Sequence, residues 1–107
     1  MIALPEPIAA YFGGQNAADA AAALACFADD AVVVDEQREI RGLAAIRTWR
    51  QETTDRYRPT VEPIAASQSG GTTIVSARVS GPFPGSPVTL EFRFGVRGDK
   101  IATLEIA

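Results

Sequence analysis

The first part of the chain spaces its hydrophobic residues as a helix does. Ile8, Tyr11 and Phe12 recur at intervals of three and four residues. They follow a start that contains two prolines, and a helix tolerates proline in its first turn. This spacing predicts a helix over residues 5–16.

After Asp19 the sequence predicts a second helix and then a strand. The Ala-rich stretch predicts a second helix over residues 20–27 that includes Phe27, because Asp is a favourable N-terminal cap and Ala is the strongest helix former. An acidic pair at 29–30 is typical of a turn, and three β-branched valines follow it. We therefore expect a strand that ends near Asp35.

A third helix is expected over residues 43–55, after a short strand at 39–41 and a glycine. Ile46, Trp49 and Thr53 share one face of this helix and are expected to pack inward. Its charged side chains are expected on the outer, solvated side: Arg47, Arg50 and Glu52.

From residue 59 onward the pattern is that of β-strands separated by glycine-containing turns. Strands are expected over residues 60–67, 72–80, 88–96 and 100–106. In the third of these, hydrophobic and polar residues alternate, which predicts a half-buried strand with Leu90 and Phe92 facing inward. Helices followed by a run of antiparallel strands predict an α+β fold, with the helices on one face of a curved sheet, in a single domain over residues 1–107.

One of the expected strands is apolar on both faces. Ile74 lies on one face of it, and Val75 and Ala77 lie on the other. A sheet with one face in water needs apolar residues on one side only. We therefore expect a second copy of the chain to cover the convex face of the sheet, as a homodimer.

Composition narrows the possible functions. The 107 residues include 10 basic and 13 acidic side chains, a net charge of −3, which offers no general attraction to nucleic acid or to an anionic membrane surface. The chain has no histidine and a single cysteine, Cys26, so histidine-based metal sites, Ser-His-Asp triads and internal disulfides are excluded.

No targeting or membrane segment is expected. No apolar run is long enough to span a membrane, and no basic residue precedes Arg38, whereas a secretory leader begins with a basic region. We therefore expect a cytoplasmic protein. The preference for Arg over Lys and the abundance of Ala are typical of a GC-rich bacterial genome.

Several short motifs fall in one order along the chain: ADDAVVVD at 28–35, RG at 41–42, AIR at 45–47 with Trp49, and FRF at 92–94 followed by GDKI at 98–101. With these motifs the sequence resembles the nuclear transport factor 2-like superfamily, in particular its SnoaL-like and ketosteroid isomerase-like branch. The resemblance covers nearly the whole chain. It implies a cone-shaped, cystatin-like antiparallel sheet wrapped around three N-terminal helices.

The resemblance also implies a candidate catalytic pair. Tyr11 falls where ketosteroid isomerases carry the tyrosine of the oxyanion hole, and Asp35 falls where they carry the general base. Their second oxyanion donor, a protonated aspartic acid, corresponds to Leu90, which cannot donate a hydrogen bond. Phe27 and Arg50 similarly stand where some isomerases carry supporting tyrosines.

In the geometry of the family, six residues would line the interior of the cone: Phe27, Trp49, Val88, Leu90, Phe92 and Leu104. They either surround a ligand cavity or fill the interior as plain core. A cavity of this kind suits a small apolar carbonyl compound, because ligand pockets are mostly apolar with a few polar groups. No cofactor and no metal are expected.

Two functions remain open. In the first, Asp35 moves a proton next to a carbonyl that Tyr11 polarises, as in a steroid delta-isomerase or a polyketide cyclase. In the second, the chain is a non-catalytic module for dimerisation or ligand sequestration, with Tyr11 in the core and Asp35 an ordinary acid beside Arg38 or Arg41. The coincidence of Tyr11 and Asp35 favours the first function, and Leu90 favours the second.

Overall fold

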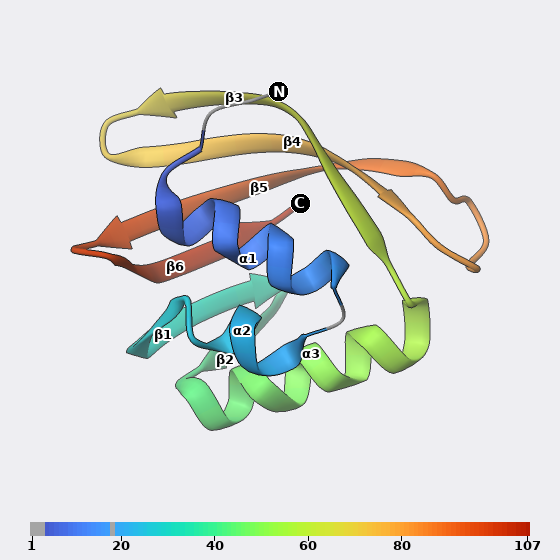
Figure 1. The fold of residues 1–107 in the computed structure, drawn as a ribbon, viewed down its shortest axis with the longest axis horizontal. Helices are drawn as coiled ribbons and strands as arrows, with labels where there is room; N and C mark the ends of the chain where they lie inside the picture. Colours follow the sequence, from blue (N-terminus) through green and yellow to red (C-terminus); the bar gives the residue numbers. More distant parts are fainter. Residues whose placement is uncertain (1–3, 18) are drawn as a thin grey trace.

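In the part of the chain that the structure describes, six strands form one strongly twisted sheet and three helices pack against it (Figure 1). A computed structural model describes residues 4–17 and 19–107. The elements in chain order are α1 (Glu6–Asn16), α2 (Ala20–Leu24), β1 (Phe27–Asp35), β2 (Arg38–Arg41), α3 (Leu43–Tyr57), β3 (Thr60–Ser69), β4 (Thr72–Ser80), β5 (Val88–Arg97) and β6 (Lys100–Ile106).

The order of strands in the sheet is β2-β1-β6-β5-β4-β3. The expected α+β fold with a curved sheet is confirmed. One pairing differs from the expectation of a wholly antiparallel sheet, because β1 pairs with β6 in parallel. These two strands are far apart in the sequence, so the intervening elements provide the crossover that a parallel pair needs.

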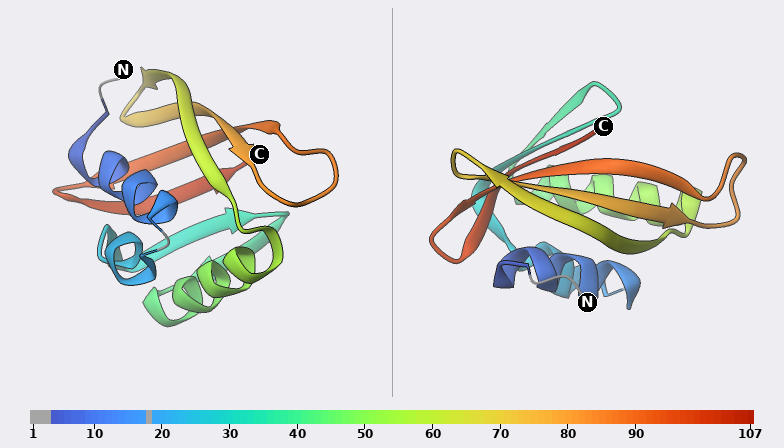
Figure 2. Two further views of the ribbon diagram at one scale, coloured as in Figure 1. Left: turned by 45° about the vertical axis from the view of Figure 1, so that its right-hand side comes forward. Right: turned by 90° about the horizontal axis from the view of Figure 1, so that it is seen from above.

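The helices pack against the apolar face of the sheet. Figures 1 and 2 show α1 lying across one face of the sheet, while α3 runs beside β1 and β2. Phe12 of α1 packs edge to face on Phe92 and Phe94 of β5, with ring centroids 5.4 and 5.7 Å apart. The inward orientation expected for Phe92 is confirmed, and Arg93 pairs with Glu91 on the opposite, outer face.

The end of α2 and the start of β1 differ from the sequence prediction. Asp19 caps α2 as expected, since its Oδ1 accepts a hydrogen bond of 3.0 Å from the amide of Ala22. The helix nevertheless ends at Leu24, and Phe27 begins β1. The acidic pair at 29–30, which was expected to form a turn, lies within β1, where the pairing with β6 is irregular. A bulge allows a strand to carry such exposed polar residues without ending.

The outer side of α3 was predicted correctly at two of the three charged residues assigned to it. Arg47 and Glu52 are exposed, but Arg50 is 5% exposed and therefore buried. Arg50 lies four residues after the buried Ile46, so both fall on one side of the helix. The expectation of a solvated Arg50 was wrong, and this arginine belongs to the interior.

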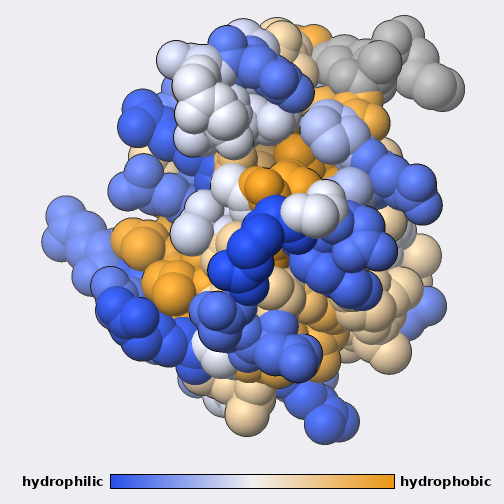
Figure 3. All heavy atoms as spheres, turned by 90° about the vertical axis from the view of Figure 1, so that its left-hand side faces the viewer, coloured by the Kyte–Doolittle hydropathy of each residue, from blue (hydrophilic) through white to orange (hydrophobic). Residues whose placement is uncertain are grey.

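The surface mixes polar and apolar side chains. Figure 3 shows one face, on which hydrophobic patches lie among hydrophilic side chains. On the sheet, half-buried Val32, Val34 and Ile74 line a shallow depression that the helices do not cover. Within the described residues, no helix combines the length and the apolar character that crossing a membrane requires.

Candidate active site

A cavity of about 200 Å³ lies between α1, α3 and the inner face of the sheet. Most of its wall is apolar. The apolar lining residues are Trp49, Pro59, Val61, Val79, Phe83, Val88, Leu90, Phe92 and Ile106. The polar side chains that reach the cavity come from α1, from the end of β1 and from α3: Tyr11, Gln15, Asp35, Glu36, Arg50, Thr53 and Tyr57. An apolar wall with a few polar groups is typical of a ligand site.

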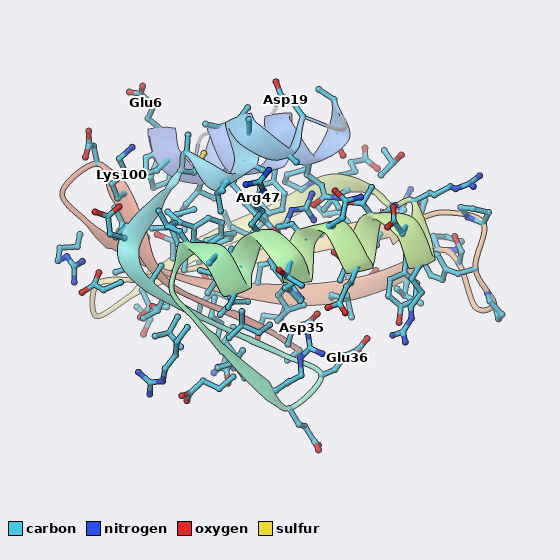
Figure 4. All side chains as sticks on the ribbon, turned by 90° about the horizontal axis from the view of Figure 1, so that it is seen from below. Glu6, Asp19, Asp35, Glu36, Arg47 and Lys100 are labelled. Carbon is cyan, nitrogen blue, oxygen red and sulfur yellow. The ribbon has the colours of Figure 1, made fainter. Side chains whose placement is uncertain are left out.

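Asp35 is the last residue of β1 and is half-buried at the cavity. The indole Nε1 of Trp49 donates a hydrogen bond of 2.9 Å to its Oδ2. Figure 4 shows Asp35 and Glu36 on one side of α3, with Arg47 on the other side, toward α2. The contact with Trp49 fixes the carboxylate and leaves Oδ1 without a side-chain hydrogen bond among the described residues.

The surroundings of Asp35 make its carboxylate a stronger base. Burial raises the pKa of Asp35, and the charge of Glu36 raises it further. The hydrogen bond from Trp49 and the charge of Arg38 lower this pKa without cancelling the effect of burial. Asp35 does not form an ion pair with Arg38 or Arg41, which pair instead with other carboxylates.

The raised pKa of Asp35 predicts a change of stability with pH. A carboxyl whose pKa is higher in the folded than in the unfolded state binds its proton more tightly when folded, so ionisation destabilises the fold as pH rises. Asp35→Asn should therefore melt at a higher temperature than the wild type at pH 7. The gain should shrink as the pH falls toward about 4, the ordinary pKa of Asp.

Thermal unfolding between pH 4 and pH 7 tests this expectation, with Asp99→Asn as the control. Asp99 is an exposed acid in the turn between β5 and β6, where the same change of charge should leave the melting temperature nearly unchanged. An Asp35→Asn variant no more stable than the wild type at pH 7 would contradict the argument.

Tyr11 lies on α1 and is 2% exposed. Its ring packs edge to face on Phe12, Phe27 and Phe94, at centroid distances of 5.4 to 5.7 Å. Burial raises the pKa of Tyr11 to about 12, against the lowering effect of Arg50. The hydroxyl thus keeps its proton at neutral pH, and it forms no hydrogen bond with another described residue, which leaves it available as a donor in the cavity.

Arg50 and Gln15 reach the cavity although neither was predicted to line it; the family resemblance had placed only Arg50 near the site, at the position of a supporting tyrosine. The guanidinium carbon of Arg50 lies 5.9 Å from the ring centroid of Tyr11 and 5.8 Å from that of Trp49. Its Nε is buried and has no hydrogen-bond partner. Gln15 is buried one helical turn after Tyr11. The spacing of four residues, from Ile46 to Arg50 and from Tyr11 to Gln15, is the signal that could have identified both.

The structure gathers most of the residues predicted for the site. Besides Tyr11 and Asp35, the predicted lining residues that reach the cavity are Trp49, Val88, Leu90 and Phe92. Phe27 and Leu104 are buried but do not line it. Phe27 begins β1 at the end opposite to Asp35, and Leu104 pairs with Val33 and Phe94 in the middle of the sheet. Their side chains form core instead of cavity wall.

A hydrogen-bonded cluster borders the exposed side of the cavity. The hydroxyl of Tyr57 donates to Oε1 of Glu36 at 3.1 Å, and its ring meets Phe83 edge to face. Residues 4–17 and 19–107 contain no group of three His, Cys, Asp or Glu side chains placed to hold a metal ion. The charged and phenolic side chains that line the cavity are Asp35, Glu36, Tyr11, Tyr57 and Arg50.

Comparison with known proteins adds a family and several similar structures. The family model described as "SnoaL-like domain" matches residues 8–104. No curated protein matches the chain. Among solved structures, a proposed polyketide cyclase from Sinorhizobium meliloti is 38% identical, with a TM-score of 0.93, over 97% of this chain and 95% of that one.

Two more distant structures share the fold. A cystatin-fold protein from Novosphingobium aromaticivorans is 20% identical, with a TM-score of 0.80, over 100% of this chain and 99% of its own. A protein with a ketosteroid isomerase-like fold from Catenulispora acidiphila, in complex with trimethylamine, is 21% identical, with a TM-score of 0.82, over 98% of this chain and 86% of its own.

Proposed function

The chain belongs to the SnoaL-like domain family, and from this premise we propose that it binds a small carbonyl compound and moves a proton on the carbon next to the carbonyl. The observation that carries the proposal is the presence of Asp35 and the Tyr11 hydroxyl at one apolar cavity. The similarity to a proposed polyketide cyclase supports the same chemistry, because ring closure also begins with removal of a proton next to a carbonyl.

The proposed step needs no cofactor. Asp35 accepts the proton through Oδ1 as the carbon–hydrogen bond breaks, and the electron pair moves to the carbonyl oxygen to form an enolate. Tyr11 donates a hydrogen bond to that oxygen, where negative charge develops. Isomerisation follows when Asp35 returns the proton to another carbon, and ring closure follows when the enolate attacks a second carbonyl.

The size of the cavity favours a ligand smaller than a steroid. Its volume of about 200 Å³ is below the range of about 300 to 1,000 Å³ that is typical of sites for drug-sized molecules. Leu90 lines the cavity and gives no second hydrogen bond to an enolate. We therefore expect activity on a Δ5-3-ketosteroid to be weak or absent.

A ligand screen combined with Tyr11→Phe tests the proposal. Small cyclic ketones and steroids are screened by thermal shift, since a ligand that binds the folded state stabilises it by an amount that grows with the logarithm of its concentration over its dissociation constant. Turnover is then measured on 3-cyclohexen-1-one, whose isomerisation to the conjugated enone is followed by ultraviolet absorbance. Tyr11→Phe should lower turnover by about 10² to 10³, the effect of one lost oxyanion donor, with a smaller change in affinity.

The matched control for Tyr11→Phe is Tyr57→Phe, which removes a hydroxyl at the border of the cavity that already bonds to Glu36. It should leave the rate nearly unchanged. A wild-type protein that is stabilised by no ketone in the screen would contradict the proposal.

A non-catalytic dimerisation module is the second candidate, and the apolar Leu90 in the cavity favours it. We propose that the chain forms a homodimer through the uncovered face of the sheet, where Val32, Val34 and Ile74 are half-buried. Sedimentation equilibrium at micromolar concentration should then give twice the chain mass of 11.3 kDa. Ile74→Lys should shift it to the monomer, and a wild-type mass of one chain would contradict the dimer.

A further inference from the structure

Arg50 is a buried cation whose counter-ion is absent from the described part of the chain. Its side chain is 5% exposed, its Nε has no hydrogen-bond partner, and it forms no ion pair with another described residue. Other arginines do pair with carboxylates, and they are exposed: Arg38, Arg41, Arg56, Arg78, Arg93 and Arg97. Arg47 and Arg58 are also without an ion pair among the described residues, but they are exposed to solvent. Burial of an unpaired charge is unfavourable, so the buried Arg50 calls for a function.

Aromatic rings hold the Arg50 guanidinium without using its donors. The rings of Tyr11 and Trp49 each lie within 6 Å of its carbon, at 5.9 and 5.8 Å. Cation–π contacts of this kind offset part of the cost of burial through electrostatic attraction to the ring. They do not satisfy the N–H groups, which lie in the plane of the guanidinium and point outward from its rim.

The carboxylates that line the cavity do not act as counter-ions to Arg50. Asp35 and Glu36 are the two carboxylates that line it, and neither forms an ion pair with Arg50. Oδ2 of Asp35 instead accepts the Trp49 hydrogen bond, and Glu36 pairs with Arg56 at 3.9 Å. A positive charge thus lines a mostly apolar cavity with no negative partner among the described residues.

We propose that Arg50 is the binding residue for a carboxylate on the ligand, so that the natural ligand is a small oxo acid and not a neutral ketone. This inference rests on the proposed function, because it places the ligand in the same cavity. The carboxylate pairs with the Arg50 guanidinium, and the carbonyl oxygen approaches the Tyr11 hydroxyl. A planar guanidinium matches the two oxygens of a carboxylate better than any other side chain does.

A carboxylate explains Arg50 better than an enolate does. The guanidinium carries its charge at all times, so it attracts an anion that exists before the reaction as well as one that forms during it. An interaction made equally with substrate and transition state changes affinity and leaves the chemical step unchanged. Loss of Arg50 is therefore expected to weaken binding more than turnover at saturation.

The test compares an oxo acid with its neutral carboxamide, which is similar in shape, and with the unsubstituted ketone. 3-Oxocyclohexane-1-carboxylate, its carboxamide and cyclohexanone are titrated into the wild-type protein at pH 7, with affinity from calorimetry and with the Arg50 Nε–H resonance followed by NMR. The carboxylate should bind about ten- to a hundred-fold more tightly than the carboxamide, as expected for hydrogen bonds to a charged group. It should also shift the Arg50 resonance.

Variants identify the residue responsible. Arg50→Met should remove the preference for the carboxylate, and Arg50→Lys should retain part of it, because a lysine keeps the charge but not the planar donor pair. Arg47→Met is the control, since Arg47 is an exposed arginine of the same helix that lies toward α2. It should bind all three compounds as the wild type does.

Asp35→Asn separates this inference from the proposed function. The variant lacks the base but keeps Arg50, so it should still prefer the carboxylate even where turnover is lost. Equal affinity for the carboxylate and the carboxamide in the wild type would overturn the inference, and so would an Arg50 resonance that the carboxylate does not shift. An Arg50→Met variant that retains the affinity of the wild type but loses turnover would also overturn it, in favour of enolate stabilisation. If Arg50→Met does not fold, the wild-type ligand pair and Arg50→Lys still decide.

Discussion

Asp35→Asn is expected to lower turnover of 3-cyclohexen-1-one by at least about 10² to 10⁴, the usual contribution of a general base. The amide keeps the shape of the carboxylate, and its oxygen can still accept the hydrogen bond from Trp49 Nε1. It cannot take a proton from carbon at neutral pH. The loss should therefore appear in kcat, with the fold intact.

The pH profile of the wild type provides an independent check on Asp35. Activity requires the ionised carboxylate, so it should fall at low pH with a midpoint above the ordinary pKa of Asp, because burial raises the pKa of Asp35. Asp99→Asn, at an exposed turn, should keep the rate and the profile of the wild type. Undiminished turnover in Asp35→Asn would exclude Asp35 as the base.

Trp49→Ala is expected to destabilise the protein by about 3 to 5 kcal/mol. Trp49, on α3, is 4% exposed, lines the cavity and donates a hydrogen bond from its Nε1 to Asp35. Truncation removes this apolar surface and leaves a hole that the surrounding side chains fill only in part. The loss is a large share of a total stability of about 5 to 15 kcal/mol, and urea unfolding measures it.

Trp49→Phe separates the packing of Trp49 from its hydrogen bond. The phenyl ring keeps most of the buried surface, so the loss of stability should be smaller than for Ala. The hydrogen bond from Trp49 lowers the pKa of Asp35, and its removal should move the acidic limb of the pH–rate profile to higher pH. A urea midpoint for Trp49→Ala equal to that of the wild type would contradict the structural role of this residue.

Local sequence patterns were sufficient for most of the elements. The strands β4 and β6 begin and end where the pattern of residues 72–80 and 100–106 places them, because alternation of apolar and polar residues and the flanking turns are local signals. The prediction was wrong at Phe27, where Ala-rich helix propensity continues past the real end of α2. Pairing with β6 decides that segment, and no local signal reports a partner some 75 residues away.

The candidate site was predictable only in part. Tyr11 and Asp35 came from a resemblance to a family, and the chain brings both to one cavity. The resemblance placed Arg50 at the position of a supporting tyrosine, but Arg50 was expected in solvent because charged residues on a helix are usually solvated. Its contact with the ring of Tyr11 on α1 depends on how α1 and α3 pack. Phe27 and Leu104 were wrongly assigned to the cavity wall, because a sequence pattern does not distinguish an apolar residue of the core from one that lines a cavity.

By itself, then, the sequence determined most of the segments that become helices and strands and most of their apolar faces, because propensity, capping and periodicity act within a few residues. Only the tertiary structure decided that β1 runs parallel to β6, that Trp49 bonds to Asp35 and that Arg50 lines the cavity without an ion pair among the described residues. These features depend on how distant segments pack, and burial and charge at the site exist only after that packing has formed.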